Sequence, residues 1–247
     1  MNIPRINLHI HSTYSDGKSS IEKIIKKAIS EGLEYIAITD HFTNSWKANI
    51  IPTLDTSYKI DKYLNEVETL NLQIKELNQN LIVLKGIEID LGSTDSYISS
   101  LIKPLDFDII LFEYLETHES ISFLKNTISK WKNDVNGKRF PLLGLAHFDP
   151  SYFQFSNMDI LFSFLSEFNI FFEFNSRYSQ YYSTKYTPFF QKMKIREISV
   201  SIGSDSHNLS NIGNIKEPLE AIKYFSLQQQ LFKLIKVLDE RFKNHLR

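Results

Sequence analysis

The chain has 247 residues, of which 42% are hydrophobic, and its formal net charge is -1. This length is enough for one large α/β domain with a sizeable core, and the near-neutral charge gives no overall attraction to nucleic acid or to an anionic membrane. Because the chain has no cysteine, it cannot form a disulfide, a zinc–thiolate site or a cysteine nucleophile.

No run of about 18 uninterrupted apolar residues occurs, so a membrane-spanning helix is not expected. The opening stretch MNIPRINLHIH lacks the charged and apolar regions of a signal peptide. We therefore expect a cytoplasmic protein without a membrane partner. The sequence makes no prediction of the oligomeric state.

Apolar runs typical of strands alternate with amphipathic stretches typical of helices. The expected strands are residues 6–11, 35–39, 81–89, 107–111, 142–147, 170–174 and 199–203. The clearest expected helix follows the first strand and ends near Gly32, and its apolar face carries Ile21, Ile24, Ile25, Ala28 and Ile29. Further helices are expected at 58–78, 120–133, 157–168 and 188–196, with a C-terminal amphipathic helix at about 228–245.

This alternation predicts a parallel sheet with helices between its strands. Seven such units follow one another without a linker rich in proline, glycine or serine. We expect an α/β fold, a distorted (β/α)7 TIM-like barrel that forms a single domain over residues 1–247. In such a barrel the chemistry collects at the carboxyl ends of the strands, so polar residues should follow the apolar runs.

Polar residues do follow them. Five of the seven histidines lie at expected strand ends, and three acidic residues accompany them. The set is His9, His11, Asp16, His41, Glu88, His147, Asp205 and His207. Because alternate residues of a strand face the same side, His9 and His11 should both point into the barrel, and Asp205 and His207 of GSDSH should lie together.

Imidazoles and carboxylates gathered inside a barrel need either mutual hydrogen bonds or a cation. A packed core does not require so many of them, so the pattern favours a metal cluster. Nitrogen and oxygen ligands suit zinc, manganese or iron. Eight ligands exceed the needs of one tetrahedral ion, which predicts two or three divalent ions with Glu88 as the bridging carboxylate.

Three further residues are candidates near this cluster. Asp40, in ITDH, either orients a ligand histidine or binds metal itself. Asn175 and Arg177 follow the sixth strand, where Arg177 is either a surface ion pair or a bidentate clamp on phosphate. Three divalent ions would outweigh three carboxylates and a bridging hydroxide, and the net positive charge would suit a phosphate dianion.

The segments HIHSTYSDG, ITDH, GIEI, AHFD and GSDSH, in this order, resemble the PHP family of polymerase-associated and histidinol-phosphatase-type phosphoesterases. The resemblance covers residues 5–225 and implies a distorted barrel of seven βα units with a two- or three-metal site at the carboxyl ends of the strands. It implies three ligand sets: His9, His11, Glu88 and Asp205 for one ion, Glu88 and His147 for a second, and Asp16, His41 and His207 for a third.

One segment departs from the family pattern. The family usually has a histidine at the end of the fourth strand, where this chain reads DIILFEYLETHES. Glu113 has the better position for the missing ligand, and His118 has the commoner ligand type. Both residues stay candidates, and the occupancy of the second site depends on which of them is the ligand.

The resemblance implies a metal-dependent phosphoesterase in which a metal-bridging hydroxide attacks a small phosphomonoester and Arg177 holds the non-bridging oxygens. The stretch NSRYSQYYSTKYTPFF loosely resembles histidinol-phosphatase-like members, which makes histidinol phosphate one candidate substrate. The main competing function is that of a nuclease or oligonucleotide phosphodiesterase, which would need a basic groove. An amidohydrolase-type C–N hydrolase and a non-catalytic binding module are less favoured by the sequence.

Overall fold

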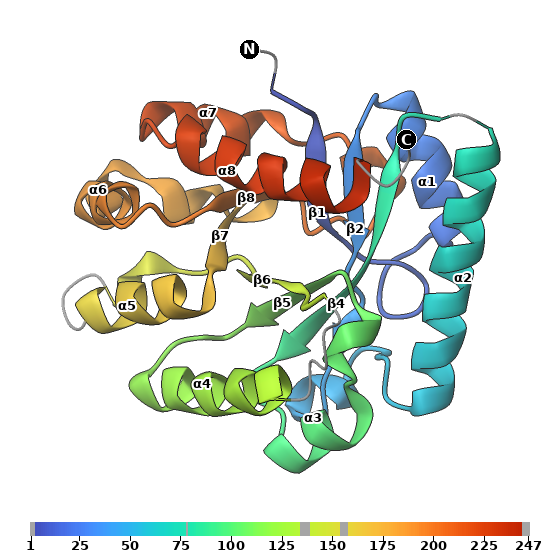
Figure 1. The fold of residues 1–247 in the computed structure, drawn as a ribbon, viewed down its shortest axis with the longest axis horizontal. Coiled ribbons are helices and arrows are strands. Elements are labelled where there is room, and N and C mark those ends of the chain that lie inside the picture. Colours follow the sequence, from blue (N-terminus) through green and yellow to red (C-terminus); the bar gives the residue numbers. More distant parts are fainter. Residues whose placement is uncertain (1–2, 78, 134–138, 154–157, 244–247) are drawn as a thin grey trace.

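The computed structural model describes residues 3–77, 79–133, 139–153 and 158–243. Its centre is a sheet in which every registered pair of strands is parallel and the order in space follows the order in the chain (Figure 1). The strands of this path are β1 (Ile6–Ile10), β2 (Tyr35–Ile38), β4 (Ile82–Asp90), β5 (Ile109–Glu113), β6 (Leu142–Leu145), β7 (Ile170–Asn175) and β8 (Val200–Gly203). They match the seven expected strands.

The sheet closes on itself almost completely. The last strand position meets the first at one parallel bridge between Ile10 and Ser206, where the His11 N–H donates to the Ser206 carbonyl oxygen at 3.0 Å. The pairing of β1 with β2 shifts in register between Asn7 and Ile10, around His9. Such irregularities re-aim side chains and are common beside active sites. The distorted seven-stranded barrel predicted from the sequence is confirmed.

The second strand position is interrupted. After β2 ends at Ile38, the short strand β3 (His41–Phe42) pairs again with β4, and Thr39 and Asp40 lie between the two. The expected strand 35–39 corresponds to β2, and the additional pairing at β3 was not expected. Between the two, the Asp40 carbonyl oxygen accepts the Glu88 N–H at 3.1 Å, and the Asp40 side chain turns toward the first βα loop.

Helices cover the outside of the strands (Figure 1). They are α1 (Ile21–Ser30), α2 (Ser57–Glu76), α3 (Asp95–Leu101), α4 (His118–Asn133), α5 (Met158–Phe168), α6 (Thr187–Ile195), α7 (Lys216–Tyr224) and α8 (Gln228–Leu238). A π-helical turn over Asp239–Lys243 continues α8, and residues 244–247 of the expected C-terminal helix lie outside the described residues. Within the described ranges, no helix has the length and apolar character to cross a membrane.

Two helices, α3 and α7, were not predicted from the sequence. The first is short and rich in serine, and it begins because the Thr94 side chain accepts a hydrogen bond from the Tyr97 N–H. The second carries Pro218 in its first turn, where proline is tolerated because no intrahelical donor is needed there. Proline in KEPLEAIKY therefore marks the start of a helix.

Tyr63 joins α2 to the strands at the point where β2 ends. Its hydroxyl is buried and lies 2.7 Å from the Ile38 carbonyl oxygen and 2.8 Å from that of Gly86, and it accepts a hydrogen bond from the Gly86 N–H at 3.3 Å. A buried hydroxyl in this position satisfies backbone groups that the interrupted strand leaves without partners.

We expect Tyr63→Phe to lower the free energy of unfolding by about 1–3 kcal/mol, because it leaves buried backbone polar groups unsatisfied. Urea denaturation would measure the change. Tyr58→Phe is the matched control, since this tyrosine is on the same helix but is 74% exposed. Equal effects of the two substitutions would contradict the assigned role of the Tyr63 hydroxyl.

Candidate metal centre

The eight predicted ligands come together at the carboxyl ends of the strands. Among the described residues, four groups place ligand atoms within 4.8 Å of one another. They are His11, Asp16, His41 and His207; His9, Glu88 and His147; His9, His11 and Asp205; and His41, Glu88 and Glu113. Because these groups share members, they form one continuous cluster.

The first βα loop brings Asp16 to the cluster, and Asp40 holds this loop. The Asp40 carboxylate accepts hydrogen bonds from the backbone N–H of Ser12 (2.8 Å) and Ser15 (3.1 Å) and from both hydroxyls (2.6 Å each). Gly17 closes the loop, where any side chain would collide with the backbone of His11. The oxygens of Asp40 therefore face serines, and its role in the structure is to position Asp16.

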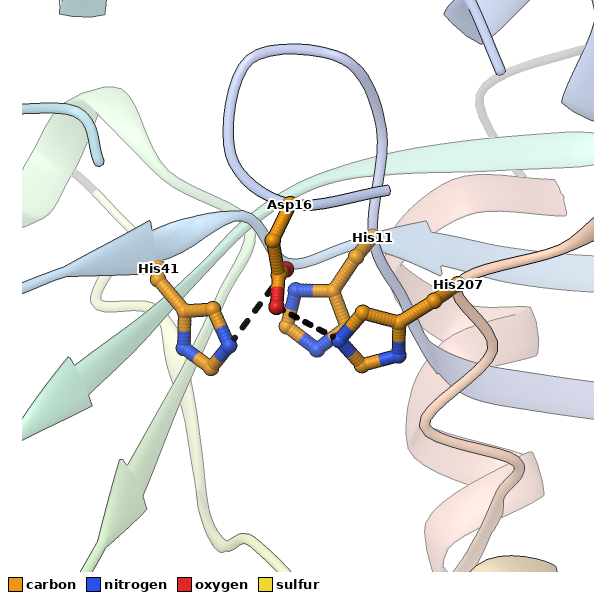
Figure 2. A group of neighbouring side chains, drawn as sticks. All are labelled: His11, Asp16, His41 and His207. Atoms are coloured by element: carbon orange, nitrogen blue, oxygen red, sulfur yellow. Dashed lines mark hydrogen bonds and ion pairs between the residues drawn. The ribbon is translucent and has the colours of Figure 1, made fainter. Parts of the chain in front are cut away.

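Asp16 lies between two imidazoles, with His11 beside them (Figure 2). Its Oδ2 is 3.0 Å from His207 Nε2 and its Oδ1 is 3.6 Å from His41 Nε2. The His11 ring stacks against both histidines, with centroid separations of 4.3 Å to His41 and 4.4 Å to His207. Residues from four separate segments thus aim nitrogen and oxygen atoms at one small volume.

Glu173 orients the first histidine and was not predicted from the sequence. Its Oε1 lies 2.9 Å from His9 Nδ1, and its Oε2 accepts hydrogen bonds from the His147 backbone N–H (2.7 Å) and the Asn175 side chain (3.1 Å). A carboxylate at Nδ1 fixes the ring and leaves Nε2 free as a ligand. Asn175, which the sequence predicted to bind substrate, is buried, and its side-chain amide donates to Glu173.

Glu88 occupies the middle of the cluster and is completely buried. Its Oε1 lies 3.1 Å from His147 Nε2 and 3.3 Å from His9 Nε2, and its Oε2 lies 2.8 Å from His41 Nδ1. The two oxygens face different histidines, which is the arrangement that a bridging carboxylate needs.

The donor atoms fit bound cations better than they fit one another. Among the described residues, three buried side-chain atoms of the cluster have no hydrogen-bond partner: Asp16 Oδ1, His41 Nδ1 and Glu88 Oε2. The last two are only 2.8 Å apart, yet their orientation does not make a hydrogen bond. Buried polar atoms without hydrogen-bond partners are rare, and such atoms on either side of the His41 ring fit bound metal ions.

The electrostatics of the cluster are correspondingly uneven. Burial opposes protonation of His9, but Glu173 and Glu88 outweigh it and raise the pKa of His9 well above its usual value. Burial and the neighbouring His41 lower the pKa of His11 to about 3. Burial also opposes protonation of His41, whereas Glu88 and Glu113 raise its pKa to about 10. The carboxylates thus favour positive charge on the imidazoles that they contact, whereas burial and a neighbouring cation disfavour it on His11.

Glu113, at the end of β5, belongs to one of the four ligand groups. None of these groups, among the described residues, includes His118. The His118 ring is at the start of α4 and packs edge-on against Phe153, with centroids 6.0 Å apart. The carboxylate of Glu113 already has a partner, because Lys47 Nζ lies 2.7 Å from both of its oxygens. Of the two candidates, the structure brings Glu113 to the site.

Backbone strain also concentrates at the cluster. His147 has a φ of 32° and Asp205 a φ of 46°, in the left-handed region that costs a residue with a side chain about 1–3 kcal/mol. Tyr114, directly after Glu113, has a φ of 64°. Such conformations persist only where the surrounding structure enforces them, and here they follow the strands that carry ligands.

Two cavities flank the cluster. One of about 320 Å³ is lined by Asp205, His207 and the half-exposed Arg177, whose Nη1 lies 3.0 Å from Asp205 Oδ2. The other, of about 240 Å³, opens beside His147 and is lined mainly by aromatic and acidic side chains: Tyr114, Glu116, Asp149, Tyr152, Tyr178 and Tyr181. A larger cavity of about 640 Å³ lies at the opposite end of the barrel, beside α2 and the start of β4, and holds none of the cluster residues.

The sequence model of the PHP domain family matches residues 7–208 of this chain. The chain belongs to the PHP family. This membership confirms the family and the enzyme class expected from the sequence, a metal-dependent phosphoric ester hydrolase. A 105-residue stretch is 32% identical to the DNA polymerase/3'-5' exonuclease PolX of Bacillus subtilis, and the match covers 42% of this chain but only 17% of that relative's length.

Several solved structures share the fold at low sequence identity. The histidinol phosphate phosphatase of Lactococcus lactis, solved with zinc, L-histidinol and phosphate, has a TM-score of 0.59 and 17% identity over 91% of this chain and 94% of its own. The putative histidinol phosphatase of Listeria monocytogenes has a TM-score of 0.58 and 14% identity over 85% and 97% of the two chains. A further match comes from a structure report on YwqE of Bacillus subtilis and CpsB of Streptococcus pneumoniae, described as metal-dependent tyrosine phosphatases. It has a TM-score of 0.54 and 16% identity over 89% of this chain and 86% of its own.

We expect Asp40→Asn to weaken metal binding by about 10–100-fold, because an amide cannot accept all the hydrogen bonds that hold the Asp16 loop. Isothermal titration of the metal-stripped protein with Mn²⁺ or Zn²⁺ would measure the affinity. Asp55→Asn is the control, since Asp55 is an exposed acid paired with Lys59. Unchanged affinity in Asp40→Asn would show that the loop does not depend on this carboxylate.

Proposed function

We propose that the chain hydrolyses a small phosphomonoester with the help of two or three divalent ions. The observation that carries this proposal is the buried cluster of histidines and carboxylates with Arg177 at its rim. Zinc, manganese and iron suit these nitrogen and oxygen ligands. Bound ions of this kind supply hydroxide near neutral pH and neutralise charge on the phosphate.

Two parts of the cluster have the ligands to hold an ion by themselves. His9, His11, Glu88 and Asp205 form one set around β1, β4 and the end of β8. Asp16, His41 and His207 form the other with His11 against them (Figure 2). Glu88 and His147 are the start of a third set. Each set draws its residues from at least two separate strand positions, so the barrel itself fixes their separation.

Arg177 is placed to hold the phosphate. One guanidinium nitrogen pairs with Asp205, while 55% of the side chain remains exposed toward the adjoining cavity. A planar guanidinium can donate to two oxygens of a phosphate at once. Of the two interpretations of Arg177 in the sequence, the pairing with a candidate metal ligand favours the phosphate clamp.

The cavity beside His147 suits the leaving group. The Tyr178 ring lies 4.6 Å from that of His147 and stacks on Tyr181 at 5.5 Å. Stacked tyrosines bind an aromatic ring, and the carboxylates of Glu116 and Asp149 on the same wall attract a cation. Histidinol phosphate carries both a ring and an amine, and the Lactococcus neighbour was solved with L-histidinol and phosphate. It is therefore the first compound to test.

Nuclease activity is the second candidate because the PolX relative is named as a 3'-5' exonuclease. The cavities give less support to it. Among the described residues that line them, Arg177 is the one lysine or arginine, whereas Glu116 and Asp149 add negative charge. A single strand is usually held by a positively charged groove that follows its backbone. This lining favours a small monoester.

Phosphate release by the metal-stripped chain, before and after addition of Mn²⁺ or Zn²⁺, tests the proposal. We expect metal-dependent release from phosphomonoesters, histidinol phosphate among them, and none from Asp205→Ala, which controls for contaminating phosphatase. Cleavage of diesters or short oligonucleotides alone would support the nuclease. A chain that binds metal but hydrolyses no phosphate ester would overturn both.

Arg177→Met should raise the KM for the phosphomonoester by about 10–100-fold, because a charge-assisted contact to the phosphate is lost. The amount of bound metal should not change, since no ligand atom is removed. Arg196→Met is the matched control, as this arginine pairs with Asp159 on the surface. Steady-state kinetics at saturating metal would measure KM, and an unchanged value would assign Arg177 to the Asp205 ion pair alone.

A further inference from the structure

Lys47 reaches the metal centre from outside the family's ligand pattern. Its Nζ lies 2.7 Å from both carboxylate oxygens of Glu113, and its side chain is only 14% exposed. Glu113 in turn has one oxygen 3.6 Å from His41 Nδ1 and the other 4.0 Å from His147 Nε2. Glu113 thus ends the strand after which the resemblance led us to expect a ligand histidine, and the ammonium group of Lys47 covers its carboxylate.

The loop that carries Lys47 is held in place by its own hydrogen bonds. Asp90, a buried residue at the end of β4, accepts hydrogen bonds from the hydroxyls of Thr43 (2.8 Å) and Ser45. The Ser45 hydroxyl oxygen then accepts the Lys47 N–H at 3.3 Å and caps the short helical turn Trp46–Asn49. These hydrogen bonds fix the backbone of Lys47, so the fold itself sets the position of this lysine beside Glu113.

Glu113 is consequently a poor metal ligand in this chain. Both of its oxygens contact an ammonium, and without them the second ligand set consists of His147 with Glu88 and His9, which also belong to the first set. Zinc-type catalytic sites use three protein ligands as a rule. His147 is then the one ligand that the second set does not share.

We propose that Lys47 takes the place of one ion at Glu113, so that the chain holds two ions and a fixed ammonium. This inference rests on the proposed function, because it concerns the same metal centre. An ammonium has no open coordination position, so it neutralises charge and donates hydrogen bonds but cannot activate water. The two complete ligand sets, around His9 and around Asp16, retain that task.

Counting bound metal without any substrate tests the proposal. The protein and its variants would be dialysed against the same low concentration of Zn²⁺ or Mn²⁺, and the metal per chain measured by mass spectrometry. We expect about two ions in the unaltered chain and about two in Glu113→Gln, because Glu113 holds none. Lys47→Met should bind about three, since it releases Glu113 as a ligand.

Lys125→Met is the matched control, because Lys125 pairs with Glu167 between the surface helices α4 and α5, and it should bind as many ions as the unaltered chain. Three ions in the unaltered chain, with one lost in Glu113→Gln, would overturn the proposal. No gain of metal in a folded Lys47→Met would also overturn it. If Lys47→Met does not fold, the unaltered chain and Glu113→Gln decide the question.

These outcomes are separate from failure of the proposed function. A chain that holds two ions but releases no phosphate would lose the phosphoesterase assignment and keep the assignment of Lys47. A chain that releases phosphate but holds three ions would lose only the assignment of Lys47. A chain that binds no ion would lose both.

Discussion

The structure depends on burying imidazoles and carboxylates whose donor atoms cannot satisfy one another. Glu88 is fully buried among four histidines. Burial opposes its ionisation, but His9 and His41 hold the pKa of Glu88 well below its usual value. Buried charge is costly unless it is paired. Partial pairing leaves atoms such as His41 Nδ1 without a hydrogen-bond partner, and positive charge on or between these groups stabilises the cluster.

Three carboxylates behind the cluster keep this arrangement in place. Asp40 fixes the loop that carries Asp16, Glu173 fixes His9 and the backbone of His147, and Asp90 fixes the loop that carries Lys47. Each accepts hydrogen bonds from a segment that follows a strand. Preorganised surroundings of this kind set ligand geometry, and their loss impairs binding although no ligand is removed.

The sequence predicted those parts of the molecule that periodicity controls. Seven apolar runs and the acids and histidines after them were enough to place the strands and to collect the cluster, because strand ends converge in a barrel. The break after Ile38 and the contact of Lys47 depend on hydrogen bonds between distant segments. The helices α3 and α7 are short, and their signals are a threonine cap and a proline in the first turn, which periodicity does not detect. Glu173 had a signal, a single charge within the apolar run IFFEF, that alternation would have pointed into the barrel.

Strands and loops supply different parts of the site, and this difference explains how one metal centre can serve different substrates. Most ligands lie on strands or close to their ends, and Asp16 lies in the first βα loop, whereas Arg177, Tyr178 and Lys47 lie in short helical turns of later βα loops. Loops accept substitution more readily than the strands on which they stand. A change of charge at Lys47 or of ring at Tyr178 can therefore alter the number of ions or the leaving group while the barrel and its central Glu88 stay the same.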